Sequence, residues 1–166
     1  MLSNLIKNKE YLRSILFGIE DSLISTTGLI AGISVGSDNK KFILMAAIVA
    51  VIIEAVSMGV GEYLSDETIQ ELDKRKRHRE KPFISGGLLT ISYLIAGMVP
   101  IIPVILFDFP TSLILSVILA FLSLFIIGYI KGKVVHTNSY RSGFKILFVG
   151  GIATLLGLFV GLFFKI

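Results

Sequence analysis

Four carboxylates lie inside runs of otherwise apolar residues: Glu20, Asp21, Glu54 and Glu62. An acidic residue at the centre of a membrane-spanning helix costs about 2.5 to 3.5 kcal/mol on insertion scales. Such residues therefore usually face the protein interior or an aqueous cavity, where they bind cations or carry protons. We take these four side chains as candidate functional residues, on condition that the segments around them cross a membrane.

The composition indicates that the segments around these acids cross a membrane. Of the 166 residues, 54% are hydrophobic and 17% are charged, and the mean hydropathy is +0.83. Soluble domains contain about 45 to 50% apolar and about 25% charged residues. The absence of cysteine excludes a disulfide scaffold and any metal site built on thiolates. The net charge of +4 resides mainly in the connections between apolar runs, so we expect no nucleic-acid partner.

Five apolar runs are long enough to cross a bilayer core, which takes about 20 helical residues. They cover residues 15–36, 42–64, 83–107, 112–130 and 144–164. The first lacks the small-residue cleavage site of a signal peptide, so we expect it to be permanent. The connections are too short for a second domain. The sequence predicts an all-α polytopic membrane protein with one five-helix transmembrane domain over residues 1–166.

The basic residues predict the orientation. With the N-terminus in the cytoplasm, thirteen of the 16 bases lie inside, and only Lys40, Lys41 and Lys165 lie outside. This distribution follows the positive-inside rule. An odd number of spans argues against an internal two-fold repeat, so we expect a homodimer. We see no targeting signal and expect the plasma membrane of a prokaryote-like cell.

Spacing brings the candidate residues together. Glu54, Met58 and Glu62 recur every four residues, which keeps them on one face of the second span. Asp21 and Met58 each lie six residues from the cytoplasmic end of their span, about 9 Å deep. They should therefore share one layer if the first two spans pack side by side. Three neighbours are further candidates for lining the same path: Glu20, Ser25 and Ser57.

These residue types favour a divalent cation. Carboxylates alone suit magnesium, calcium or manganese, whereas the thioether of Met58 favours a softer ion such as ferrous iron. Burial favours the neutral form of a carboxyl group, so Asp21 and Glu54 can alternate between a metal and a proton. Met58 can equally be a packing residue, and Glu62 can extend to water. Glu67 and Glu71, one helical turn apart, are either a cytoplasmic metal-collecting pair or a solvated helix face.

Two strings carry a resemblance to a known family. Residues 17–23, Phe-Gly-Ile-Glu-Asp-Ser-Leu, and residues 57–65, Ser-Met-Gly-Val-Gly-Glu-Tyr-Leu-Ser, resemble the vacuolar iron transporter family. Gly28 and Gly32 in the first span, and residues 97–103 in the third, extend the similarity over nearly the whole chain. The resemblance implies a dimeric five-helix fold that exchanges ferrous iron for protons and moves the metal out of the cytosol.

The resemblance also implies roles and departures. In that family the residues corresponding to Asp21 and Met58 line the ion path, which is formed by the first two helices near the dimer interface. Here Ser22 replaces a usual glycine, Glu54 stands where a small residue is common, and Leu158 replaces a frequent tyrosine. Fuller members carry a long cytoplasmic metal-binding domain after the second span, and this chain has only residues 65–82 there.

We therefore expect a proton-coupled transporter of divalent metal, most simply ferrous iron, whose cargo is its only metal and which binds no permanent cofactor. Its partners are membrane lipid, the metal ion, protons and a second copy of the chain. The sequence holds no phosphate-binding glycine loop, and we expect no enzymatic activity. One alternative is manganese transport by the same mechanism. The other is a non-transporting module that docks a cytosolic partner through the basic run at residues 74–81.

Overall fold

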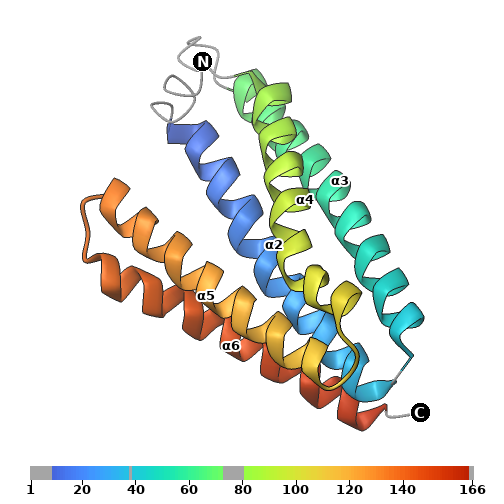
Figure 1. The fold of residues 1–166 in the computed structure, drawn as a ribbon. Helices are drawn as coiled ribbons and strands as arrows, with labels where there is room; N and C mark the ends of the chain where they lie inside the picture. Colours follow the sequence, from blue (N-terminus) through green and yellow to red (C-terminus); the bar gives the residue numbers. More distant parts are fainter. Residues whose placement is uncertain (1–8, 38, 73–80, 165–166) are drawn as a thin grey trace.

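The computed structural model describes residues 9–37, 39–72 and 81–164, and this part of the chain is all-α (Figure 1). The five long helices are α2 (Lys9–Gly36), α3 (Lys40–Leu72), α4 (Pro82–Leu106), α5 (Thr111–Val134) and α6 (Ser139–Phe163). Each is long and apolar enough to cross a membrane. The expected all-α class with five candidate spans is therefore confirmed.

Two helices are longer than the apolar runs that predict them. The helix α2 begins at Lys9, ahead of the run that starts at Ile15, and α3 continues to Leu72 beyond the run that ends at Leu64. The polar residues that follow the second span are therefore helical as far as Leu72. The basic run 74–81 lies outside the described residues except for Lys81.

The helix α6 begins where Asn138 Oδ1 accepts a hydrogen bond from the Arg141 N–H at 3.1 Å, a typical N-cap.

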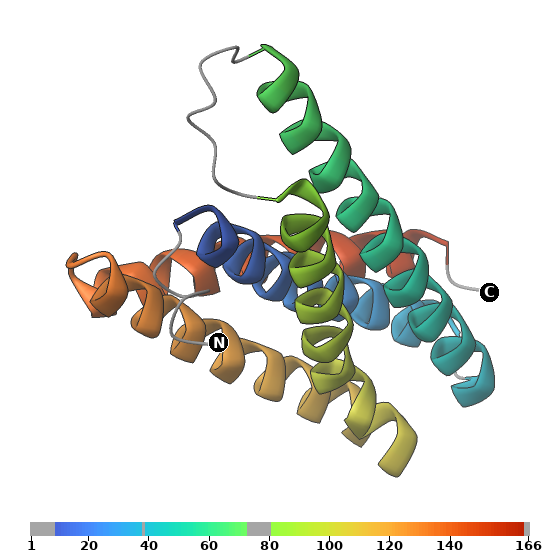
Figure 2. The same ribbon diagram turned by 90° about the horizontal axis from the view of Figure 1, so that it is seen from above.

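The helix α2 is central to the bundle (Figures 1 and 2). It packs extensively against α4 and α6, while α5 packs on α6 and α3 packs mainly on α4. The expectation that the first two spans pack side by side is therefore only partly correct, because α2 and α3 make the sparsest contact of all the neighbouring helix pairs. The helix α4 packs closely on both.

The helices α2 and α6 approach each other through glycines. A Cβ atom added to Gly157 would overlap the carbonyl oxygen of Gly28, and one added to Gly161 would overlap that of Gly32. Small residues at four-residue spacing allow this close approach of two backbones in a membrane. The small-residue stripes of the first and last spans therefore meet each other.

We expect Gly157→Ala to lower the stability of the bundle by about 1 to 3 kcal/mol, because the new methyl group must push two backbones apart. Thermal unfolding of the purified protein in detergent measures the effect. Gly151→Ala is the matched control, since a Cβ atom there meets nothing within 4 Å. Equal melting temperatures for the two variants would contradict the proposed close contact.

Candidate functional site

Glu54 of α3 is held by hydroxyl groups from two other helices. Ser25 Oγ of α2 donates to Glu54 Oε2 at 3.1 Å, and the Tyr93 hydroxyl of α4 donates a short hydrogen bond to the same oxygen. The Ser25 and Tyr93 oxygens lie 2.6 Å apart, and Tyr93 is fully buried. Both donors engage Oε2, which leaves Oε1 of the carboxylate available for another partner. Three helices therefore converge on one carboxylate near the middle of the second span.

Asp21 supplies a second carboxylate near this site. It lies one helical turn before Ser25 on α2, is half-buried, and is close enough to Glu54 for their charges to interact. Among the described residues, neither Asp21 nor Glu54 has a basic side chain within 4 Å. Two neighbouring carboxylates in a poorly solvated place repel each other unless a cation or a proton neutralises one of them. The geometry is thus suited to binding positive charge.

Met58 packs in the apolar core and is also a candidate metal ligand beside Asp21. Its half-buried side chain packs against an apolar cluster that includes Ala55 and Tyr93. The Ser25–Glu54 contact also sets the register of the antiparallel helices α2 and α3, and one turn further toward the predicted cytoplasmic side are Asp21 and Met58. The common layer of these two residues is compatible with this register and stays a prediction.

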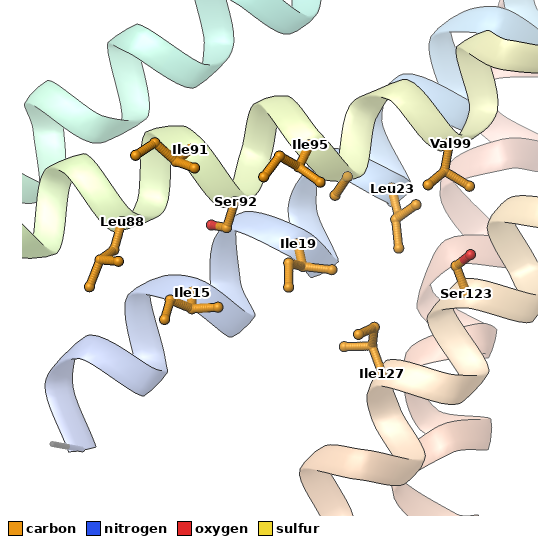
Figure 3. Close-up of a pocket in the computed structure, with 11 residues that line it drawn as sticks. Ile15, Ile19, Leu23, Leu88, Ile91, Ser92, Ile95, Val99, Ser123 and Ile127 are labelled. Atoms are coloured by element: carbon orange, nitrogen blue, oxygen red, sulfur yellow. The ribbon is translucent and has the colours of Figure 1, made fainter. Parts of the chain in front are cut away.

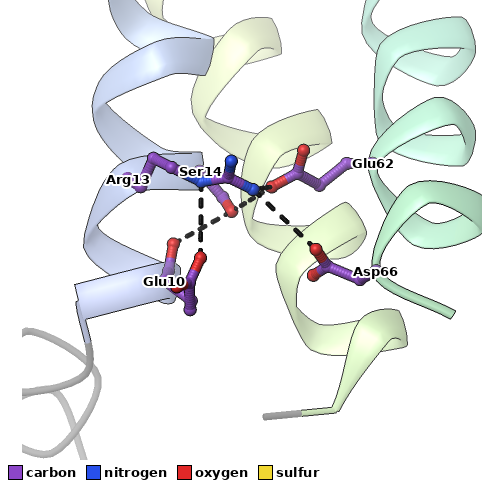
Figure 4. Close-up of polar contacts among 5 residues, drawn as sticks. All are labelled: Glu10, Arg13, Ser14, Glu62 and Asp66. Atoms are coloured by element: carbon purple, nitrogen blue, oxygen red, sulfur yellow. Dashed lines mark hydrogen bonds and ion pairs between the residues drawn. The ribbon is translucent and has the colours of Figure 1, made fainter. Parts of the chain in front are cut away.

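Glu62 lies at the end of the bundle where α2 begins, and it is paired with a base (Figure 4). Arg13 Nη2 lies 2.8 Å from Glu62 Oε1, and Ser14 Oγ donates to the same oxygen at 2.7 Å. The Arg13 guanidinium also lies 3.8 Å from Asp66 and 3.5 Å from Glu10. Only 12% of the Glu62 side chain is exposed. Glu62 therefore does not simply extend to water, and Arg13 partly neutralises its charge.

The side chain of Glu20 contacts α5, whereas that of its neighbour Asp21 lies near Glu54 of α3. Lys131 Nζ of α5 lies 2.9 and 3.1 Å from the two carboxylate oxygens of Glu20. An ammonium in this position neutralises the acid, so Glu20 differs from Asp21 and Glu54, which have no basic partner among the described residues. Ser57 is exposed on α3.

The two acids beyond the second span differ in their surroundings. Glu67 accepts a hydrogen bond from the Tyr63 hydroxyl at 2.7 Å, whereas Glu71 is exposed. Across residues 9–37, 39–72 and 81–164, no three acidic or histidine side chains come together in a way that could hold a metal ion. A metal at Asp21 and Glu54 must therefore complete its coordination with other atoms, such as the Met58 sulfur, hydroxyl groups or water.

Three residues that contact the candidate acids were missed from the sequence. Tyr93 was not singled out, although a lone phenol in the middle of an apolar span is a signal that could have identified it, because a buried hydroxyl needs a partner. Arg13 and Lys131 were considered only as markers of orientation. Their ion pairs join residues 49 and 111 positions apart, so no local pattern reveals them.

A separate cavity does not contribute to a cation site. It has a volume of about 430 Å³ and lies between α2, α4 and α5 (Figure 3). Its lining is aliphatic apart from Ser92 and Ser123, and none of its lining residues is charged. A cation would gain little from such a surface, so the carboxylate site lies elsewhere in the bundle.

Long apolar helices around two carboxylates that have no basic partner among the described residues place the chain in the class of integral membrane proteins that carry ionisable groups inside the bundle. The family model described as "VIT family" matches residues 12–82 and 70–162, and the chain belongs to this family. The resemblance seen in the sequence motifs is therefore confirmed.

The relatives are distant but cover most of the chain. Vacuolar iron transporter 1 of Arabidopsis thaliana is 23% identical over 206 residues, which covers 87% of this chain and 82% of the relative. Vacuolar iron transporter homolog 2 of the same plant is 22% identical over 172 residues, covering 92% and 88%. An uncharacterized protein of Methanocaldococcus jannaschii is 24% identical over 172 residues, covering 92% and 89%.

These alignments differ in length. The alignment with vacuolar iron transporter 1 spans 206 residues, more than the 166 of this chain, so that relative has at least 40 positions without a counterpart here. The other two alignments span 172 residues, so they require far fewer positions of the relative to lack a counterpart in this chain. These two relatives therefore align with most of this chain without a long insertion.

Proposed function

We propose that this protein is a proton-coupled transporter that moves a divalent metal, ferrous iron, out of the cytosol. The proposal is supported by membership of the VIT family and by the names of its relatives, which include vacuolar iron transporters. The observation that carries it is the carboxylate pair Asp21 and Glu54, which has no basic partner among the described residues and lies between helices that can span a membrane.

The carboxylate pair exchanges metal for protons because either can neutralise its negative charge. A divalent cation bound between Asp21 and Glu54 Oε1 neutralises both carboxylates, and protons neutralise them when the metal leaves. Ser25 and Tyr93 hold Glu54 Oε2 throughout, so Oε1 remains directed toward the ion. Because metal and protons compete for the same oxygens, movement of one against the other follows from alternate exposure of the site to the two sides.

The rest of the path runs toward the end of the bundle where α2 begins. From that end a cation meets Glu62, then the layer of Met58 and Asp21, and then Glu54. The same end holds Lys9, Arg13 and the bases of the α5–α6 turn (Figure 1), which supports a cytoplasmic location under the positive-inside rule. The protein acts as a homodimer in the cell membrane.

A flux assay tests the proposal. The purified protein is reconstituted into proteoliposomes with an imposed pH gradient, and ferrous iron, manganese and zinc are offered separately. We expect ferrous uptake that depends on the gradient and stops when a protonophore collapses it. Absence of flux for every ion, from protein shown to be folded, would contradict a self-sufficient transporter and favour the docking module.

Manganese is a second candidate because of one observation, the packing of Met58 against apolar side chains. If the sulfur binds the metal, Met58→Leu removes a soft ligand while nearly conserving volume. We then expect the apparent affinity for ferrous iron to fall about tenfold, or about 1.4 kcal/mol, while that for manganese changes little. Competition between the two ions in the flux assay measures this preference. An unchanged preference would assign Met58 to packing and favour manganese.

A further inference from the structure

Arg13 of α2 lies among three carboxylates at the end of the bundle where α2 begins (Figure 4). Its Nη2 atom is 2.8 Å from Glu62 Oε1 and 3.8 Å from Asp66 Oδ1, both on α3. Its Nε atom is 3.5 Å from Glu10 Oε2, one turn earlier on α2. One guanidinium therefore contacts acids from both of the helices that carry the candidate path residues.

The acids around Arg13 outnumber the bases. Lys9 and Lys81, at the starts of α2 and α4, form no ion pair with any of the three carboxylates. In the part of the chain that the structure describes, three carboxylates thus face a single guanidinium, and negative charge is in excess. A surface with such an excess attracts cations and raises their local concentration.

Arg13 covers acids that are themselves sheltered. The side chains of Glu62 and Asp66 are 12% and 13% exposed, whereas that of Arg13 is 58% exposed. The guanidinium therefore lies on the open side of the two carboxylates. A base with this degree of exposure gains little from its ion pairs, about 0 to 1 kcal/mol, so Arg13 can leave Glu62 at a small cost.

The contact lies where a cation would enter the proposed path. Glu62 is the first path carboxylate from this end, and its Oε1 atom accepts from both Arg13 and Ser14 of α2. These contacts join α2 to α3, the neighbouring pair with the sparsest packing. A guanidinium and a metal ion are attracted to the same carboxylates and repel each other.

We propose that Arg13 is a built-in competitor of the metal ion and sets the metal concentration at which the path fills. This inference rests on the proposed function and deepens it. A divalent cation carries twice the charge of the guanidinium and displaces it toward the exposed side. A monovalent cation carries only the same charge and makes none of the charge-assisted hydrogen bonds of Arg13, so it displaces Arg13 poorly. Arg13 thereby favours divalent over monovalent ions.

The half-saturating metal concentration in the flux assay tests this role. Arg13→Gln removes a positive charge close to the entry carboxylates, so that concentration should fall about fivefold to tenfold. The maximal rate should change little, because Asp21 and Glu54 are untouched. Arg13→Lys keeps the charge and should stay near the parental value. A fall as large as that of Arg13→Gln would show that charge is not the cause.

Arg141→Gln is the matched control. It is the same chemical change at an exposed position on α6, and Arg141 forms no ion pair among the described residues. We expect a nearly parental half-saturating concentration, with gel filtration showing that every variant is folded. An equal fall in Arg13→Gln and Arg141→Gln would reveal only diffuse attraction, and an unchanged or higher value in Arg13→Gln would overturn the role of Arg13.

Binding of manganese to the purified protein separates this inference from the proposed function, because it needs no transport. Electron paramagnetic resonance of the free ion measures it, and Arg13→Gln should bind manganese more tightly than Arg141→Gln. Tighter binding without flux of any ion in the parent would contradict the proposed function but not the competition by Arg13. Flux in the parent, with equal binding by the two variants, would overturn the competition alone.

Discussion

Asp21→Asn is expected to abolish metal uptake into proteoliposomes, with a loss of about 100-fold or more in the initial rate. Asparagine preserves the size of the side chain but carries no negative charge, so a divalent cation would face Glu54 alone. Removing one partner from a buried charge interaction costs about 3 to 5 kcal/mol, and 3 kcal/mol corresponds to more than 100-fold in affinity. Flux of ferrous iron under an imposed pH gradient measures the loss.

The control for Asp21→Asn is Asp108→Asn, the same chemical change at the opposite end of the bundle. Asp108 Oδ1 lies 3.0 Å from Lys40 Nζ, and its side chain is 87% exposed. We expect this variant to transport at the parental rate, because an exposed ion pair contributes little to stability. Gel filtration and thermal unfolding establish that both variants are folded. Normal flux in folded Asp21→Asn would remove Asp21 from the path and leave the carboxylate pair without a role.

Glu54→Gln is expected to change the coupling between metal and protons. Glutamine retains a carbonyl oxygen that accepts from Ser25 and Tyr93, but it cannot gain or lose a proton. We therefore expect the number of protons exchanged per metal ion to fall by about one, and accumulation against a metal gradient to weaken. Simultaneous recording of metal uptake and internal pH measures the ratio.

Stability separates this role of Glu54 from a structural one. In the parent, Glu54 and Asp21 are carboxylates whose charges interact without a nearby base among the described residues. Glu54→Gln removes the repulsion, so we expect its melting temperature to equal or exceed that of the parent, as is common when a functional residue is replaced. A clear drop in melting temperature together with an unchanged proton ratio would show that Glu54 only stabilises the fold.

Tyr93→Phe helps to interpret the Glu54 result. It removes one of the two donors to Oε2 and leaves both carboxylates in place, so its effect on coupling should be smaller than that of Glu54→Gln. Tyr63→Phe removes a hydroxyl that donates to Glu67, near the end of α3, and serves as its matched control. Equal effects of the two tyrosine variants would argue against a special position for Tyr93.

Much of this protein was predictable from local features of the chain. The five helices follow from the length of the apolar runs, because a backbone in lipid must satisfy its own hydrogen bonds. The candidate acids Asp21 and Glu54 follow from the cost of placing a carboxylate in such a run. The short motifs around Asp21 and Met58 identified the family. Each of these inferences needs only residue type and position along one helix.

The partners of the acids were not predictable in this way. Glu20 and Asp21 are adjacent in sequence, yet Glu20 is neutralised by Lys131 and Asp21 has no basic partner among the described residues. Glu62 is paired with Arg13, while Glu54, two turns away on the same helix, accepts hydrogen bonds from Ser25 and Tyr93. Whether an acid is paired with a base or accepts hydrogen bonds from hydroxyl groups depends on which side chains the neighbouring helices place beside it.

The physical reason lies in the nature of these helices. Helices that are apolar on nearly every side carry no clear amphipathic stripe, so their sequences do not show which face turns inward. That choice is made by packing between helices, as where Gly157 lies against Gly28 and brings α6 onto α2. Chain-local chemistry thus specified the spans and the acids within them, whereas the packing of α4 and α5 around α2 decided which acids have a basic partner among the described residues: Glu20 and Glu62 do, and Asp21 and Glu54 do not.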